Sequence, residues 1–88
     1  MKLSGSFVLR EVAGEWLAIP VGQTALQFDG MIILNPVSRV IWECLQQDTD
    51  VDRIVDAVTE RFEIDPDEAK ADVLEFFSHM NKENLIIE

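Results

Sequence analysis

The stretch DGMIILNP, residues 29–36, lies where the pattern of the chain changes from strand to helix. Asp29-Gly30 is a dipeptide typical of turns, and the apolar run Met31–Leu34 has the length of a short strand. Asn35 is then a favourable N-cap, and Pro36 occupies the first helical position, where its missing N–H removes no helical hydrogen bond. We therefore expect a strand to end at Leu34 and a helix to begin at Pro36.

Two more strands are predicted before this stretch. Ser6–Val12 is rich in β-prone residues, and Trp16–Ile19 has the pattern of the returning strand of a hairpin. Ala13–Glu15 supplies the turn, because its central glycine adopts positive φ without steric cost. Pro20–Gly22 interrupts the second strand, and residues 23–30 are expected to form a loop. Three strands joined in this way predict an antiparallel meander.

Apolar residues recur at helical spacing in three segments after Pro36. The first segment ends at Asp48–Asp50, the second has Thr49 as its expected N-cap, and the third begins with Asp65 as its N-cap. Leu85–Ile87 is expected to form a short final strand or to pack against the core. The apolar stripes are Val37, Val40, Ile41, Cys44 and Leu45, then Val51, Ile54, Val55, Val58 and Phe62, then Ala69, Val73, Phe76, Phe77 and Met80.

These elements predict an α+β fold in which a three-stranded antiparallel sheet is followed by a three-helix bundle, a winged-helix-like arrangement. The strands occupy about residues 6–34 and the helices about residues 36–84, with Asn84 as the C-terminal cap of the third helix. No repeat, composition change or Pro/Gly-rich linker divides the chain. Residues 1–88 are therefore expected to form a single domain.

The charge of the chain argues against polyanionic partners. Its 88 residues include 7 Lys and Arg against 17 Asp and Glu, a formal net charge of −10 at pH 7. Nucleic acids and anionic membranes are bound through Lys and Arg. The third predicted helix, which would enter the major groove in a DNA-binding winged helix, is itself acidic. We therefore expect neither a nucleic acid nor a membrane as partner.

Few side chains are available for catalysis or metal binding. Cys44 is the only cysteine and His79 the only histidine, so a disulfide framework and a multi-histidine metal centre are excluded. The sequence contains no phosphate-binding Gly-rich loop, nucleophile-elbow serine or metalloprotease motif. We expect a protein that is not an enzyme and needs no cofactor. No signal peptide or membrane-spanning run is found, which favours a cytoplasmic location.

Several segments match one known family in order and spacing. Residues 29–35, followed by the helical Ile41-Trp42-Glu43, resemble the family of the pyrroloquinoline quinone biosynthesis protein D (PqqD). The sequence departs from the family pattern at Pro36-Val37-Ser38 and at Asn84, where the family usually has glycine. The supporting segments are Phe7–Val12, Gly14-Glu15, Ile54–Ala57, Asp72–Phe77 and Asn84–Ile86.

The resemblance implies a non-catalytic module that recognises the leader of a ribosomally made, post-translationally modified precursor peptide. In such modules the leader adds as a strand to the third β-strand and lies in a groove against the third helix. The module then presents the peptide to a separate modifying enzyme, often a radical-SAM enzyme with iron–sulfur clusters. The resemblance assigns the receiving strand to Met31, Ile32, Ile33 and Leu34, and the groove wall to Asp72, Val73, Glu75, Phe76 and His79.

The residues themselves leave the role of Met31–Leu34 open. This run lacks the Lys, Pro or bulge that protects an edge strand, which suits strand addition. An apolar run is also typical of a central strand with both faces covered. The alternative function is a winged-helix-like protein–protein interaction domain without a peptide ligand, such as a homodimer that pairs this same strand.

The side of the third helix that faces the strand is also open. Glu68, Asp72, Glu75 and His79 flank the apolar stripe on one side, and Leu74 and Phe77 flank it on the other. The resemblance favours the flank that contains Asp72. An apolar anchor of the leader beside Phe76 or Phe77, and a basic group at Asp72 or Glu75, would suit these side chains.

Overall fold

In the computed structural model, which describes residues 1–87, the first hairpin consists of β2 (Phe7–Val12) and β3 (Glu15–Pro20). Ala13 and Gly14 join the two strands with φ values of 53° and 83°. Two consecutive residues with positive φ are typical of the type I′ turn, whose twist matches that of the flanking strands. The predicted hairpin is therefore confirmed.

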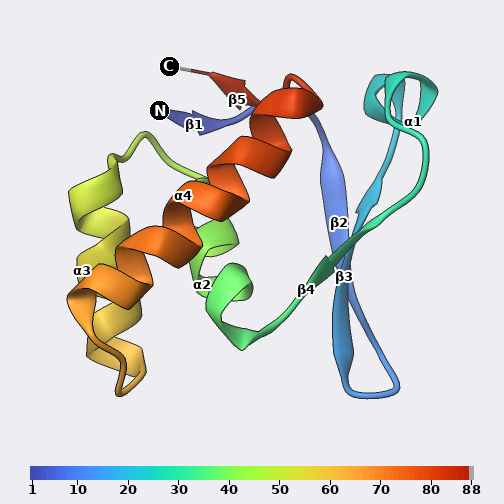
Figure 1. Ribbon diagram of the computed structural model, residues 1–88. Coiled ribbons are helices and arrows are strands. Elements are labelled where there is room, and N and C mark those ends of the chain that lie inside the picture. Colours follow the sequence, from blue (N-terminus) through green and yellow to red (C-terminus); the bar gives the residue numbers. More distant parts are fainter. Residues whose placement is uncertain (88) are drawn as a thin grey trace.

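The third strand, β4 (Ile32–Leu34), pairs antiparallel with β3, so the sheet has the order β2-β3-β4. Figure 1 shows β4 leading from the sheet into α2. Met31, predicted as part of this strand, lies just before it and is 53% exposed. The expected α+β architecture, with a three-stranded antiparallel sheet, is confirmed.

A short helix, α1 (Gln23–Gln27), replaces part of the loop expected at residues 23–30. Thr24 Oγ1 accepts a hydrogen bond of 2.8 Å from the backbone N–H of Ser6, which holds α1 against the start of β2. A helix this short depends on contacts with other segments and has no periodic apolar pattern of its own. The prediction of a loop was therefore wrong at these residues.

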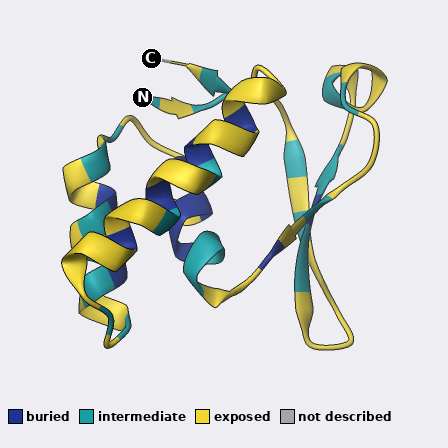
Figure 2. Ribbon diagram, viewed as in Figure 1, coloured by how far each residue is buried: buried dark blue, intermediate teal, exposed yellow. Residues whose placement is uncertain are grey.

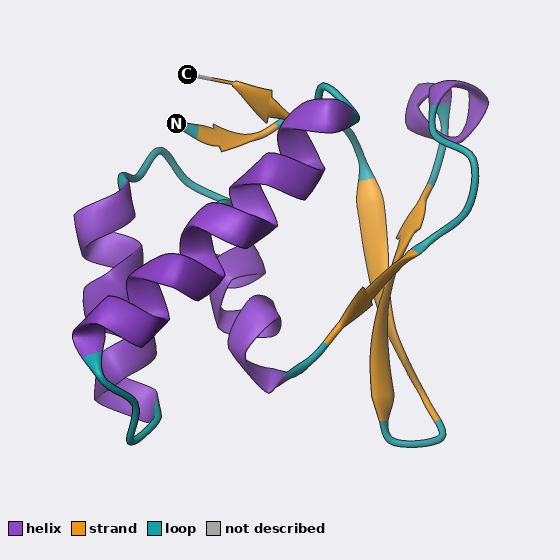
Figure 3. Ribbon diagram, viewed as in Figure 1, coloured by secondary structure: helices purple, strands orange, loops and turns teal. Residues whose placement is uncertain are grey.

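Three longer helices follow β4: α2 (Pro36–Cys44), α3 (Val51–Arg61) and α4 (Pro66–Lys82) (Figure 3). Asn35 caps α2 as expected, because its Oδ1 accepts a hydrogen bond of 2.8 Å from the N–H of Ser38. Asp65 caps α4 by accepting a hydrogen bond of 2.8 Å from the N–H of Asp67. α2 ends several residues before the predicted end, because the chain forms a turn after Leu45.

The N-cap of α3 is Asp50, and the prediction of Thr49 was wrong by one residue. Asp50 Oδ1 accepts a hydrogen bond of 2.9 Å from the N–H of Arg53. The backbone N–H of Thr49 instead donates to the carbonyl of Met1 at 2.8 Å. A carboxylate at this position also interacts favourably with the positive end of the helix dipole.

The end of α4 turns the chain back toward its beginning. Asn84 has a φ of 57°, and the N–H of Leu85 donates to the carbonyl of Met80 at 3.0 Å. This is the Schellman arrangement, in which asparagine is the usual substitute for glycine. The chain continues into β5 (Ile86–Ile87), which pairs antiparallel with β1 (Lys2–Leu3), a strand that the sequence pattern did not predict.

The core consists of two adjoining clusters, and the helices cover only one face of the sheet (Figure 2). Trp42 of α2 is 3% exposed and belongs to the cluster beneath the sheet, where its ring meets Phe7 edge-on at 5.1 Å. The buried residues between the helices are Val40, Ile41, Leu45, Ile54, Val58, Ala69, Val73 and Phe77. Those between helices and sheet are Ala18, Leu34, Trp42, Met80 and Leu85.

The cap of α3 provides a test of this fold. Replacing Asp50 with alanine should lower the free energy of unfolding by about 1 kcal/mol, because the N–H of Arg53 loses its acceptor. Asp50→Asn should retain most of the stability, and Thr49→Ala should have a smaller effect than Asp50→Ala. Urea denaturation followed by circular dichroism measures all three; an equal loss in Thr49→Ala and Asp50→Ala would contradict the assignment.

Candidate functional site

β4 is an edge strand. It pairs with β3 on one side, and within residues 1–87 no other strand pairs with it. Its three residues are apolar, and Ile33 is 65% exposed. The possibility that this run is a central strand is therefore excluded, and the strand lacks the charges and prolines that usually protect a sheet edge.

The hydrogen-bond pattern of the hairpin decides which groups of β3 face β4. Val21 N–H donates to the carbonyl of Ser6 at 3.0 Å, which makes these two residues a hydrogen-bonded pair. Bonded and non-bonded pairs alternate along an antiparallel ladder. Arg10 and Leu17 lie opposite each other and are therefore also a hydrogen-bonded pair. The N–H and C=O of Leu17 consequently face β2.

The neighbours of Leu17 on β3 face the other way, toward β4. Trp16 is paired with Leu34 and Ala18 with Ile32, so these pairs carry the hydrogen bonds between β3 and β4. Ile33 is opposite Leu17. Its N–H and C=O therefore point away from β3, into the open edge of the sheet.

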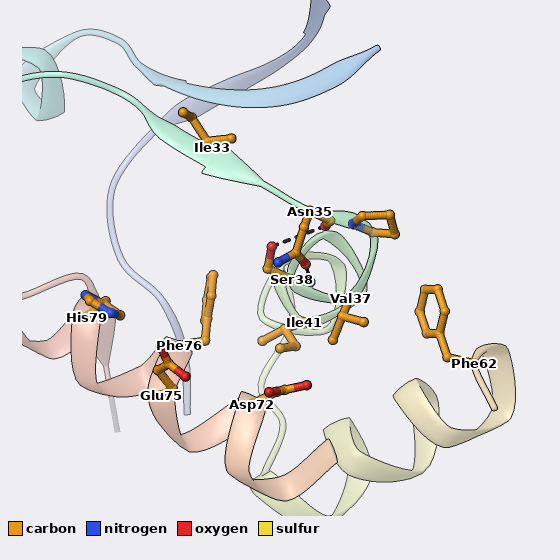
Figure 4. A pocket seen from close by; sticks show the side chains of 11 residues that line it. Ile33, Asn35, Val37, Ser38, Ile41, Phe62, Asp72, Glu75, Phe76 and His79 are labelled. Atoms are coloured by element: carbon orange, nitrogen blue, oxygen red, sulfur yellow. Dashed lines mark hydrogen bonds between the residues drawn. The ribbon is translucent and has the colours of Figure 1, made fainter. Parts of the chain in front are cut away.

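A pocket of about 530 Å³ lies beside this edge, between β4, α2 and α4 (Figure 4). α2 contributes the apolar side chains of Val37 and Ile41 to it. Phe62, at the C-terminal end of α3, closes one end. The residues that line the pocket are Ile33, Asn35, Pro36, Val37, Ser38, Ile41, Phe62, Asp72, Glu75, Phe76 and His79.

α4 forms the opposite wall of the pocket with four side chains. Asp72, Glu75, Phe76 and His79 recur at intervals of three and four residues, so they lie on one face of the helix. In Figure 4 the Phe76 ring points toward β4, between the carboxylates and the strand. The flank of α4 that faces β4 is thus the one that contains Asp72.

Five of the nine predicted site residues meet at this pocket: Ile33, Asp72, Glu75, Phe76 and His79. The other four lie elsewhere. Leu34 is 3% exposed in the core and Val73 is fully buried between the helices. Ile32 packs beneath the sheet, and Met31 is exposed outside the lining of the pocket. Ile32 and Leu34 therefore do not line the pocket themselves.

Six lining residues were not predicted. Val37, Ile41 and Phe62 belong to apolar stripes that were assigned to the core, and a stripe does not reveal which of its members border a gap. Asn35 was identified only as a helix cap, and it retains that role at the rim of the pocket. The other two, Pro36 and Ser38, occupy the first turn of α2.

The polar part of the pocket is acidic. Its lining includes two carboxylates, Asp72 and Glu75, and no Lys or Arg. Within residues 1–87 neither carboxylate forms a salt bridge. Arg39 of α2 interacts elsewhere. Its Cζ lies 3.8 Å from the centroid of the Trp16 ring, and its Nε lies 3.5 Å from Glu43 Oε1. Both pocket carboxylates remain available to a cationic ligand.

The pocket is lined by one histidine and two carboxylates, and Cys44 lies outside it. The lining has no cysteine, and burial raises the pKa of the Cys44 thiol, which packs against the helical core. Among the described residues, no group of His, Cys, Asp and Glu is arranged to hold a metal ion. Residues 1–87 also contain no helix with the length and apolar character needed to cross a membrane.

Comparison with known proteins adds a family and a fold. The family model described as Coenzyme PQQ synthesis protein D (PqqD) matches residues 22–86, from α1 into β5. No curated protein sequence matches the chain significantly. A solved structure described as TbiB1 in complex with the TbiA(β) leader peptide matches with a TM-score of 0.70 and 24% sequence identity. That match covers 97% of this chain and 94% of the other, and it shows a shared fold.

Proposed function

Because the chain belongs to the PqqD family, we propose that it binds the leader of a ribosomally made precursor peptide as a strand added to β4. The observation that carries this proposal is the juxtaposition of an open strand edge and a pocket. The N–H and C=O of Ile33 face the edge, and Asp72, Glu75 and Phe76 lie across the gap. Strand addition gains affinity from main-chain hydrogen bonds and specificity from pockets for alternate side chains.

The structural relative supports the proposal that this chain binds a leader peptide. TbiB1, which shares this fold, was solved with a leader peptide bound. The fold alone does not determine a ligand, so the argument for this chain depends on its own edge strand and pocket. Both features lie within the segment matched by the family model.

The sheet has a second edge, β2, which fits a peptide less well. β2 pairs only with β3 and is longer than β4. None of its residues lines the pocket, and Arg10 and Glu11 place charges along it. A peptide added at β2 would gain main-chain hydrogen bonds but would find no pocket for its side chains, so β4 is the favoured edge.

In this proposal the protein acts as a cytoplasmic, non-catalytic partner of a separate modifying enzyme. Ser38 in the lining donates its hydrogen bond to the Asn35 carbonyl at 3.2 Å. The carboxylates of Asp72 and Glu75 lie beside the open strand edge, which suits a basic extended peptide. The enzyme, for which a radical-SAM protein is the expected class, would act on the core peptide attached to the bound leader. Homodimerisation through β4 is the competing function, and it would occupy the same backbone groups of Ile33.

Replacing Ile33 with proline tests strand addition at β4. The N–H of Ile33 makes no bond to β3, so Ile33→Pro should keep the fold and remove the donor offered to the peptide. We expect the affinity for peptides selected from a displayed random 12-residue library to fall about tenfold or more, or roughly 1.4 kcal/mol. Fluorescence polarisation with fluorescein-labelled peptides measures the change.

Ile33→Val is the matched control, because it keeps the N–H and the β-branched side chain. Its affinity should remain within a few-fold of the wild type, and thermal unfolding should be cooperative in both variants. Equal binding by folded Ile33→Pro and wild-type protein would refute strand addition here. Sedimentation velocity addresses the competing function: a stable dimer that persists in excess peptide would favour homodimerisation.

Reversing the charge of Asp72 tests the acidic wall. Asp72→Lys should weaken the binding of a basic peptide by slowing its association, with an expected loss of about tenfold. Glu83→Lys makes the same charge change at the end of α4, outside the pocket, and should have a much smaller effect. Stopped-flow measurements at increasing salt should show the wild-type on-rate falling; a rate that rises with salt would contradict a basic ligand.

A further inference from the structure

We infer that the bound leader carries, in N-to-C order, an apolar residue, a second apolar residue and a Lys or Arg at three consecutive positions. This inference rests on the proposed function and specifies its ligand. It follows from three features: the outward direction of the Ile33 backbone, the alternation of side chains along a strand, and the unlike chemistry of the two ends of the pocket.

Ile33 sets the register of the added strand. It is the one residue of β4 whose N–H and C=O both face the open edge, since Ile32 and Leu34 bond to β3. In an antiparallel pair, a single peptide residue can donate to the Ile33 carbonyl and accept from the Ile33 N–H. Antiparallel pairing continues the pattern of the sheet and is the more stable arrangement per residue. This middle residue of the triplet therefore lies directly opposite Ile33.

The side chain of the middle residue points to the face of the sheet that the helices do not cover. Residues directly opposite each other in a sheet share a face, so this side chain lies beside that of Ile33. Leu17 is opposite Ile33 on the same face, and Val8 and Val12 of β2 are 41% and 54% exposed there. This face also carries Glu15 of β3 and Arg10 of β2. The added residue lies next to Ile33, so an apolar side chain at this position packs against it.

The two neighbours of the middle residue point toward the helices, into different environments. In Figure 4, Val37, Ile41 and Phe62 gather near the end of β4 at Asn35, whereas Glu75 and His79 lie toward the start of the strand. An antiparallel peptide meets the Asn35 end first. Its first residue therefore enters the end of the pocket lined by Val37, Ile41 and Phe62, with Asp72 on the wall that α4 forms.

The third residue of the triplet lies toward the start of β4. Side chains two residues apart in a strand are separated by about 6.8 Å. A rise of about 1.5 Å per residue in α4 therefore places the third residue at the part of the helix that carries Glu75, Phe76 and His79 when the first is near Asp72. Glu75 forms no salt bridge within residues 1–87. Lys or Arg is the side chain that complements it.

Selection from a displayed library of random 12-residue peptides on the full chain tests the triplet. Enriched peptides should align on the pattern apolar, apolar, Lys or Arg. In a synthetic peptide of that consensus, exchanging the first and third residues should reduce affinity roughly tenfold. N-methylation of the middle residue should have a similar effect, because its N–H bonds to Ile33, whereas N-methylation of the first or third residue should be tolerated.

A charge exchange identifies the acidic partner. Glu75→Lys should lower the affinity for the consensus peptide. Replacing the third peptide residue with Glu should restore binding to that variant. Glu83→Lys should show no such rescue. Failure of any peptide to bind would overturn the proposed function itself. Peptides that bind and are sensitive to Ile33→Pro, but lack the triplet, carry it in reverse order or are unaffected by Glu75→Lys, would overturn this inference and leave the proposed function intact.

Discussion

The alternation of hydrogen-bonded pairs along β3 is the constraint on which the rest of the site depends. Because Leu17 bonds to β2, its neighbours Trp16 and Ala18 bond to β4, and the backbone of Ile33 is left facing outward. A shift of one residue in this register would turn Ile33 inward and expose Leu34, which is now 3% exposed in the core. Burial of Leu34 therefore also fixes the direction of the Ile33 amide.

Much of this arrangement could be predicted from local sequence signals. Ala13-Gly14 fits a hairpin turn, Asn35-Pro36 fits a helix start, and Asp65 fits a cap, because each signal acts through its own backbone neighbours. The same holds for Asn84, whose positive φ requires no distant contact. The family resemblance is confirmed by the match over residues 22–86.

The remaining features depend on contacts between distant segments. α1 is held by the bond from Ser6 to Thr24, and the cap of α3 shifts to Asp50 while the Thr49 backbone bonds to Met1. The pocket itself is a gap where apolar stripes of different helices do not meet fully. Periodicity identified Val37, Ile41 and Phe62 as apolar but could not separate those at the gap from those in the core.

Pairing of β1 with β5 brings the two ends of the described chain together, and Figure 1 shows them on the side of α4 away from β4. A polypeptide joined at either end would leave from this side and would not cross the open edge of β4. Covalent fusion to a catalytic domain is thus geometrically permitted. Such a tether would raise the effective concentration of any ligand held at β4 near the attached domain without any change in intrinsic affinity.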